Sequence, residues 1–162
     1  YKNTNTMIFY TTIQENDPEK IRELVSQVKV FNEIEIETAK ELVEEALLDP
    51  SAYSFLFARL DDRIVGYTCF SEIPLTNKRY DLYWIAVATD QQGKGLSSQL
   101  IQMTEQKVKE EGGKALYAET SGTSDYEAAR HFYFKVGYSE VARLKDFYRD
   151  GDDKVIYGKF LQ

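Results

Sequence analysis

The segment Gln92–Ser97, with the sequence QGKGLS, holds the residue types whose spacing points most directly to chemistry. Glycines allow backbone N–H groups to come close to a ligand. The first turn of a helix presents unpaired N–H donors and the positive end of its dipole, which together favour an anion. Lys94 adds a mobile cation. The segment therefore predicts a site for a phosphate or diphosphate, although a glycine-rich turn that only begins a helix would look the same.

The elements on either side of this loop can be read from the hydrophobic pattern. The nearly continuous apolar run Leu82–Val87 predicts a central strand covered on both faces. A helix follows the loop and ends at Gly112-Gly113, with its apolar positions at Leu96, Leu100, Met103 and Val108. The glycine spacing matches neither a nucleotide P-loop nor a dinucleotide fingerprint. We therefore expect a strand, an anion-binding loop and a helix, in that order.

The rest of the chain alternates between strand and helix patterns. Asp17-Pro18 marks the start of a first helix, and a second has an apolar stripe from Ile36 to Leu47. Ser124 and Glu127 have the spacing of a capping box that opens a last helix, which Gly137 closes. Further strands are predicted at residues 7–14, 53–57, 64–70, 115–119, 138–144 and 154–161. This order predicts a mixed α/β (α+β) fold with one largely antiparallel sheet flanked by helices.

Two motifs, together with this element order, resemble the GNAT superfamily of N-acetyltransferases. The first motif is Gln/Arg-x-x-Gly-x-Gly/Ala after a strand that ends in an Ala-Val-type pair, matched here by Ile85-Ala86-Val87 and Gln92–Ser97. The second is Ala-x-x-Phe-Tyr-x-x-x-Gly-Phe/Tyr, matched by Ala129–Tyr138. The likeness covers nearly the whole chain. It implies the GNAT acyl-CoA N-acyltransferase fold.

The resemblance also implies acetyl-coenzyme A (acetyl-CoA) as the co-substrate. In this superfamily the pantetheine arm pairs with the backbone of the buried strand as an extra half-strand would, where two neighbouring strands splay apart. The diphosphate lies on the amides of the glycine loop. The cofactor-binding residues implied in this chain are Ile85, Ala86, Val87, Gln92, Gly93, Lys94, Gly95, Leu96, Ser97, Ala129 and Tyr133.

The reaction that the resemblance implies is direct attack of a neutral primary amine on the thioester in a ternary complex. A lysine-like amine has a pKa near 10.4, so only about one molecule in 2,500 is neutral at pH 7 and a base is useful. Tyr133 matches the position that donates to the leaving thiolate in many relatives, and a packing tyrosine is its alternative role. Asp81 and Glu119 are the candidate bases, and each could instead be a solvated strand end.

Composition bounds the remaining choices. A chain of 162 residues with 43% hydrophobic and 29% charged residues predicts a flexible segment 1–6 followed by a single domain, 7–162. The net charge of −7 disfavours nucleic acid and suits a cationic amine. One Cys and one His leave little for a metal site, and no apolar run reaches the length of a membrane helix. Cys69 fits a reducing compartment, so we expect a cytoplasmic protein without a metal and leave homodimer formation open.

These features predict an N-acetyltransferase whose amine acceptor is not identified by the sequence. Two other functions remain open. A non-catalytic module that binds or senses acyl-CoA would keep the phosphate loop but would not need Tyr133, because a fold does not fix a function. An enzyme that moves a different acyl group, or that acts on an alcohol, would differ in the pocket near the thioester.

Overall fold

The structure is a computed structural model that describes residues 6–162. The chain divides into two compact units, a first unit of residues 6–71 with 84–104 and a second unit of residues 72–83 with 105–162. The strand β4 (Arg79–Val87) contributes to both units, and the strand order of the seven-stranded sheet is β1-β2-β3-β4-β5-β7-β6. The expected single domain, 7–162, stays a prediction. The expected flexible segment 1–6 lies, apart from Thr6, outside the described residues.

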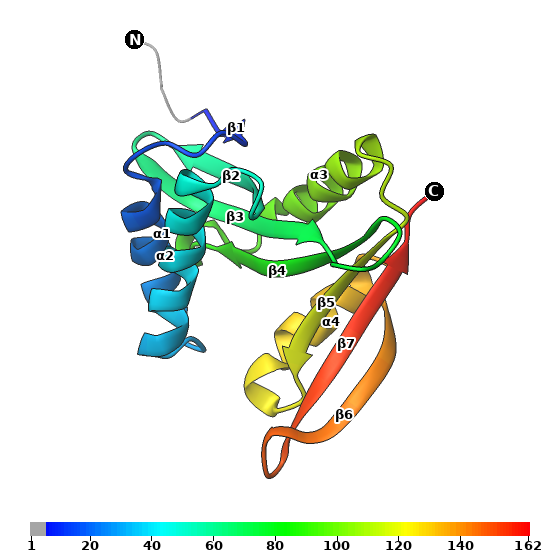
Figure 1. Cartoon of the computed structure of the whole chain (residues 1–162). Coiled ribbons are helices and arrows are strands. Elements are labelled where there is room, and N and C mark those ends of the chain that lie inside the picture. The colour runs from blue at the N-terminus through cyan, green and yellow to red at the C-terminus, as the bar shows by residue number, and fades with distance from the viewer. Residues whose placement is uncertain (1–5) are drawn as a thin grey trace. The chain divides into compact units, whose positions relative to one another are not determined.

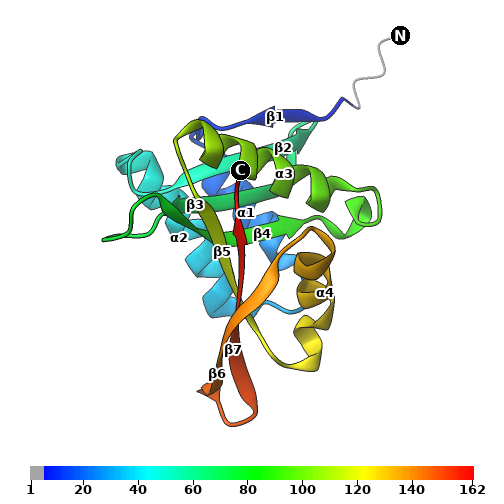
Figure 2. The ribbon, with the colours of Figure 1, turned by 90° about the vertical axis from the view of Figure 1, so that its right-hand side faces the viewer.

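The first unit is built on antiparallel strands. It contains β1 (Ile8–Tyr10), β2 (Ser54–Leu60), β3 (Arg63–Glu72) and the end of β4, with β1 paired to β2 and β2 paired to β3. The helices α1 (Asp17–Ser26) and α2 (Glu33–Leu48) lie on one side of these strands, and the first part of α3 (Leu96–Glu110) crosses the other side (Figure 2). The helix pair, the strands and α3 form three layers, and the apolar residues of this unit are buried between them.

Local sequence explains where α2 begins and which face it buries. The side chain of Asn32 accepts a hydrogen bond from the Glu35 backbone N–H at 2.9 Å, and the Glu35 carboxylate accepts one from the Asn32 N–H at 3.1 Å. This reciprocal capping box satisfies two backbone donors that the helix itself leaves unpaired. The buried residues of α2 recur at helical spacing, and they are Ile36, Ala39, Val43 and Ala46. The cap and the apolar stripe therefore fix both the start and the orientation of α2.

A glycine on β3 allows α3 to pack closely on the first unit. A Cβ placed on Gly66 would lie 2.9 Å from Leu100 Cδ1 and 3.2 Å from Leu96 Cδ2. One turn further along α3, the hydroxyls of Thr68 and Thr104 form a buried hydrogen bond of 2.7 Å. The absence of a side chain at position 66 lets the beginning of α3, just after the glycine loop, lie close to β3. The threonine pair then holds the middle of α3 against the same strand.

The second unit holds the mixed part of the sheet (Figure 1). Residues Arg79–Leu82 of β4 pair in parallel with β5 (Ala115–Ser121), which pairs antiparallel with β7 (Asp152–Phe160). The edge strand β6 (Ser139–Arg149) pairs antiparallel with β7. A single parallel pair among antiparallel ones confirms the predicted mixed, largely antiparallel sheet.

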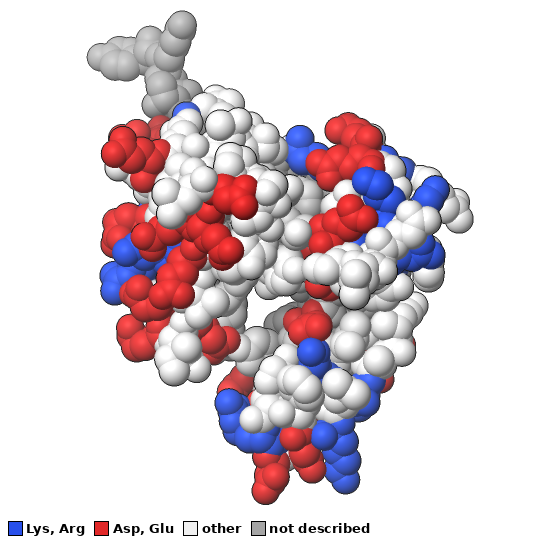
Figure 3. Space-filling view, viewed as in Figure 1, with Lys and Arg blue, Asp and Glu red and all other residues white. Residues whose placement is uncertain are grey.

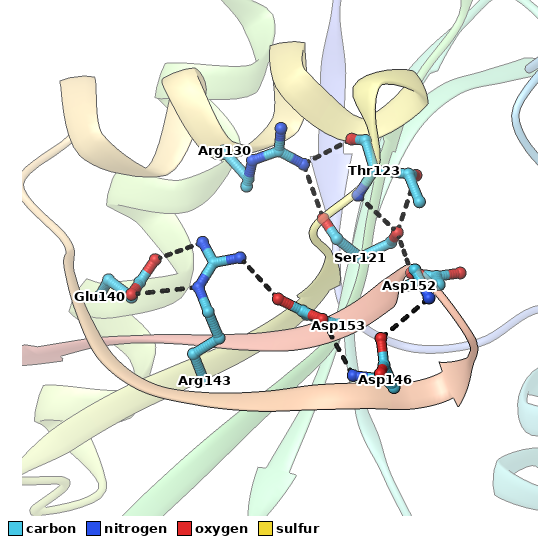
Figure 4. A network of polar contacts seen from close by, with 9 residues as sticks. Ser121, Thr123, Arg130, Glu140, Arg143, Asp146, Asp152 and Asp153 are labelled. Carbon is cyan, nitrogen blue, oxygen red and sulfur yellow. Dashed lines mark hydrogen bonds and ion pairs between the residues drawn. The ribbon is translucent and has the colours of Figure 1, made fainter.

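The start of the last helix differs from the prediction. Residues Ser124–Tyr126 form one 3-10 turn, and α4 (Glu127–Lys135) begins after it without a side-chain cap, so the capping box predicted at Ser124 and Glu127 is wrong. The guanidinium of Arg130 instead donates from one nitrogen to the carbonyls of Ser121, at 2.8 Å, and Thr123, at 2.6 Å (Figure 4). Two hydrogen bonds to main-chain carbonyls, at the last residue of β5 and just after it, therefore tie α4 to the end of this strand.

Candidate active site

The predicted phosphate loop lies at the end of β4 in the first unit. After β4 a short 3-10 turn, Thr89–Gln91, leads into the loop, and the Gln92 side-chain amide lies 3.5 Å from the carbonyl oxygen of Val87. Gly93 and Gly95 have φ angles of 77° and 80°, in the left-handed region that favours glycine. Nothing lies within 4 Å of a Cβ built on either residue. The loop is thus a main-chain surface with open space beside its glycines.

The start of α3 supplies the donors that this loop would offer to an anion. The backbone N–H of Gln99 donates to the carbonyl of Gly95 at 3.0 Å, so the amides of residues 96–98 come before the first helical hydrogen bond. The positive end of the helix dipole adds to them. Lys94 is exposed beside the loop. These donors and the open space fit a diphosphate, the group that the resemblance places there.

The strand β4 extends beyond its pairing with β5. The ladder joins Arg79–Leu82 to Ala115–Ala118 and ends there, although β4 continues to Val87 and β5 to Ser121. On the β3 side, the N–H of Ala88 donates to the carbonyl of Val65 at 2.7 Å. The ladder thus leaves main-chain groups of residues 85–87 outside the β4–β5 pairing. A strand-like arm such as pantetheine has the right chemistry to pair with them.

Tyr133 lies on α4 in the second unit among other aromatic rings. Its ring is stacked on Tyr157, with centroids 5.5 Å apart, and meets Tyr138 edge-on at 5.8 Å. The residue is buried, and this burial raises the pKa of its hydroxyl above the ordinary tyrosine value. The hydroxyl therefore stays protonated at neutral pH and is able to donate a hydrogen bond. Ala129, one turn earlier on α4, is half-buried.

A buried carboxylate that the sequence analysis did not single out supports this aromatic cluster. Glu105 accepts a hydrogen bond from the Tyr138 hydroxyl at 2.7 Å and one from the Lys159 ammonium at 3.0 Å. The second motif contains Tyr138, but nothing in the spacing of the chain links it to a residue 33 positions earlier. Glu105 and Lys159 hold the ring of Tyr138, which in turn contacts the ring of Tyr133.

Asp81 and Glu119, the two candidate bases, share one face of the sheet in the second unit. Asp81 is paired with Tyr117 in the β4–β5 register, and Glu119 lies two residues further along β5, so the two side chains point the same way. Glu119 is paired with Ile156 on β7, whereas Tyr157, which stacks on Tyr133, points to the opposite face. The structure thus brings the two carboxylates together and separates them from Tyr133 by the thickness of the sheet.

The surroundings of Asp81 suit a base. Its partial burial and, less strongly, the nearby charge of Glu119 raise the pKa of the Asp81 carboxyl above its ordinary value. A hydrogen bond from the Tyr83 side chain and the charge of Lys154 act in the opposite direction. A carboxylate with a raised pKa is a better proton acceptor than an exposed aspartate.

Glu119 has a different environment, because a lysine neutralises it. Lys154 Nζ lies 3.1 Å from Glu119 Oε1, and the Lys154 side chain is only 17% exposed. Lys154 was not singled out from the sequence, although it lies two residues after the Asp150-Gly151-Asp152 turn and begins the predicted strand 154–161. Of the two predicted bases, Glu119 is engaged in an ion pair and Asp81 is the one better placed to take a proton.

Among residues 6–162 there is no group of three or more His, Cys, Asp or Glu side chains placed to hold a metal ion. No helix in the same part is long and apolar enough to cross a bilayer. His131 is exposed on α4 and Cys69 is buried, where desolvation raises the pKa of the Cys69 thiol.

Comparison with known proteins gives a consistent family match. The model of the acetyltransferase (GNAT) family matches residues 19–138, which include the glycine loop and the whole of the second motif. N-alpha-acetyltransferase 30 of Schizosaccharomyces pombe is 30% identical over 106 residues, which cover 64% of this chain and 69% of that protein.

Solved structures show the same fold. A protein from Desulfovibrio desulfuricans assigned to the GNAT family of acetyltransferases superposes with a TM-score of 0.95 at 40% identity, covering 97% of this chain and all of that one. The ribosomal-protein-S18-alanine N-acetyltransferase of Escherichia coli has a TM-score of 0.76 at 15% identity, covering 97% and 95% of the two chains. An aminoglycoside 6'-N-acetyltransferase complexed with coenzyme A has a TM-score of 0.73 at 16% identity, covering 94% and 96%.

Proposed function

Because the chain belongs to the GNAT family of acetyltransferases and is an N-acetyltransferase, we propose that Gln92–Ser97 and Ile85–Val87 bind acetyl-CoA, that Asp81 is the base and that Tyr133 is the donor to the leaving group. The observation that carries this proposal is the glycine loop, with its two left-handed glycines directly before the amides of α3. It is the feature of the first unit with the chemistry of a diphosphate site.

The two parts of the proposed acetyl-CoA site bind by main-chain contacts. The amides after Gly95 and the cation of Lys94 would hold the diphosphate. The backbone of residues 85–87 would pair with the amide groups of the pantetheine arm, as a neighbouring strand does. Acetyl-CoA supplies a thioester carbonyl that the amine attacks and a sulfur that leaves as thiolate. Ala129 completes the proposed set on α4.

Asp81 and Tyr133 have complementary tasks in this proposal. Asp81 accepts the proton that the acceptor nitrogen loses, which its raised pKa favours. Tyr133 donates a hydrogen bond to the sulfur as negative charge develops there. A thiol leaving group with a pKa near 8.5 is a stronger acid than even an ordinary tyrosine, and burial raises the pKa of Tyr133 further. Full proton transfer from Tyr133 is therefore unfavourable, and its role is to stabilise the charge.

The acceptor we propose is a cationic amine. Carboxylates gather over α1 and α2 on the surface that Figure 3 shows, and residues 17–48 carry nine Asp and Glu against four Lys and Arg. A surface of one sign raises the local concentration of ligands of the opposite sign. The same charge disfavours a nucleic acid partner. With a reaction that uses acetyl-CoA and a free thiol at Cys69, the cytoplasm is the compartment we propose, and homodimer formation stays open.

The experiment that tests the function is release of free coenzyme A thiol from acetyl-CoA with four acceptor classes. These are a polyamine, an aminoglycoside, a peptide with a free N-terminus and an Nα-blocked lysine peptide. An α-amine with a pKa near 8 is neutral in roughly one molecule in ten at pH 7, so it depends less on the base than a lysine does. Saturable, amine-dependent release supports an enzyme. Tight binding of acetyl-CoA without release from any class would instead support the non-catalytic acyl-CoA module.

A further inference from the structure

The ammonium group of Lys154 lies between a carboxylate and an aromatic ring in the second unit. Its Nζ is 3.1 Å from Glu119 Oε1 and 4.5 Å from the centroid of the Phe147 ring. An aromatic face attracts a cation electrostatically, most strongly when the cation is partly desolvated. The two contacts come from different strands, because Glu119 belongs to β5 and Phe147 to the end of β6. They leave its side chain mostly buried.

The hairpin between β6 and β7 places Phe147 against this lysine. Asp146 has a φ of 53°, and its carboxylate accepts a hydrogen bond from the Gly151 N–H at 2.8 Å. Its own N–H donates to the Asp153 carboxylate at 2.9 Å, and Arg143 donates to the same carboxylate at 3.1 Å (Figure 4). These bonds fix the backbone directly before Phe147. The contact with Lys154 is therefore built into the hairpin.

The charged groups on this face of the sheet can be named from the register. The face is formed by β4, β5 and β7, and alternation along these strands places six titratable side chains on it besides Asp81. They are Arg79, Tyr83, Tyr117, Glu119, Asp152 and Lys154, and the Asp152 carboxylate is hydrogen-bonded to the Ser121 hydroxyl and the Arg149 guanidinium. Arg79 donates to the carbonyl of Asn77 and lies over the Phe160 ring, so its contacts point away from the carboxylate pair.

We propose that Lys154 is a positioning residue that holds Glu119 in an ion pair and leaves Asp81 as the carboxylate that takes the proton of the acceptor amine. The inference rests on the proposed function, since it assigns Asp81 the role of base. Two carboxylates side by side disfavour their charged forms, and one of them then binds a proton. The cation at Glu119 opposes this effect and favours the ionised form of Asp81, which is the form able to accept a proton.

The chain offers a matched control for Lys154 on the same strand. Lys159 is also paired with a carboxylate, Glu105, at 3.0 Å, and its Nζ lies 5.5 Å from the centroid of the Tyr138 ring. Alternation along β7 places Lys159 on the opposite face of the sheet from Lys154. Removal of either cation breaks a similar ion pair, but only one of these pairs is beside Asp81.

The experiment compares K154M, K154R and K159M by NMR titration of the Asp81 carboxyl carbon and by the pH dependence of kcat/KM with one amine. In K154M we expect the titration midpoint of the Asp81 carboxyl to move to higher pH. The acid limb of kcat/KM should move in the same direction. At a pH on that limb the loss should be about tenfold or more, while K154R stays within about twofold of the wild type. In K159M the midpoint of Asp81 should not move.

A variant of the partner carboxylate, E119Q, keeps the test informative if K154M is unstable. In E119Q the negative charge is absent, so the midpoint of Asp81 should fall, and adding K154M to E119Q should return it toward the wild-type value. An unmoved Asp81 midpoint in both K154M and E119Q would overturn the inference. The proposed base is tested separately, because D81N with full activity would remove Asp81 from the reaction without altering what the titration says about Lys154.

Discussion

The rings of Tyr133 and Tyr157 are stacked with their centroids 5.5 Å apart, at an interplanar angle of 24°. Tyr157 belongs to the same strand as Lys154 but points to the opposite face. The strand β7 thus contributes Tyr157, which stacks on the proposed donor, to one face of the sheet. To the other face it contributes Lys154, which pairs with Glu119. This arrangement allows the donor and the base to be changed independently.

Replacing Tyr133 by Phe should lower kcat by roughly 10²-fold. This is the usual cost of removing one hydrogen bond to a charge that develops in the transition state. The aromatic stack is kept, so the melting temperature and the Kd for coenzyme A should change little. Stopped-assay rates and calorimetry check the two expectations. An unchanged kcat across the whole pH range would make Tyr133 a packing residue only.

Replacing Asp81 by Asn should lower kcat/KM by about 10²–10⁴-fold at neutral pH. In the wild type, activity should fall as the pH drops through the Asp81 pKa, at a higher pH than for an exposed aspartate, because burial and Glu119 raise this pKa. D81N should lack this acid limb. Measuring kcat/KM of both proteins over a pH series, with an amine of low pKa as the acceptor, shows whether the acid limb is present.

Stability provides the control for D81N. A carboxyl whose pKa is raised on folding binds its proton more readily in the native state, so its contribution to stability declines as the pH rises through that pKa. At pH 7 the charged form therefore opposes folding, and D81N should melt at the same temperature as the wild type or slightly higher. Lost activity together with a clearly lower melting temperature would indicate damage to the fold.

The buried threonine pair predicts unequal effects of two similar changes. The Thr104 hydroxyl donates to the carbonyl of Leu100 at 2.8 Å, so Thr68 is the donor in the 2.7 Å bond between the two threonines. T104V leaves the Thr68 hydroxyl buried without its partner and should cost about 1–3 kcal/mol of unfolding free energy. T68V should cost less, since Thr104 keeps its bond to Leu100.

The double variant T68V/T104V completes this test. It removes both polar groups and leaves two side chains of similar shape, so its loss should be smaller than the sum of the single losses. Urea unfolding of the four proteins measures the coupling. Equal losses for the two single variants, or an additive double variant, would show that this hydrogen bond does not hold α3 against β3.

Much of the fold could be predicted because its signals are local. The apolar run 82–87, the period of α3 and the Asp150-Gly151-Asp152 turn each depend on neighbouring residues. The capping box at Ser124 failed because Ser124–Tyr126 form a 3-10 turn and α4 begins only at Glu127, so Ser124 does not occupy the N-cap position. The capping box of α2 was present in the sequence as Asn32 and Glu35 but went unrecognised.

The site was predictable only as far as motifs and strand alternation reach. The glycine loop and Tyr133 belong to motifs, and Asp81 and Glu119 were found as strand ends. The ion pair of Lys154 with Glu119 joins residues 35 positions apart, on strands whose register no local pattern sets. Which carboxylate is neutralised, and hence which one is suited to act as the base, therefore emerges only from the paired sheet.

Replacing Gly95 in the glycine loop by Ala should weaken the binding of coenzyme A, and a matched variant can show how much of the effect comes from backbone strain alone. Ala at Gly95 would meet nothing within 4 Å, so its cost comes from the φ of 80°, about 1–2 kcal/mol for a residue with a Cβ. If the loop relaxes to relieve this strain, the amides of α3 lose their alignment with the diphosphate. The Kd for coenzyme A, measured by calorimetry, should then rise about tenfold.

Gly112 is the matched control, because it has a φ of 83° and equally open surroundings at the other end of α3. G112A should lower the melting temperature by about as much as G95A and leave the Kd for coenzyme A unchanged. The difference between the two variants isolates the ligand contact from the backbone strain that they share. Equal affinities in G95A, G112A and the wild type would mean that the diphosphate does not rest on this loop, and the proposed acetyl-CoA site would have to be placed elsewhere.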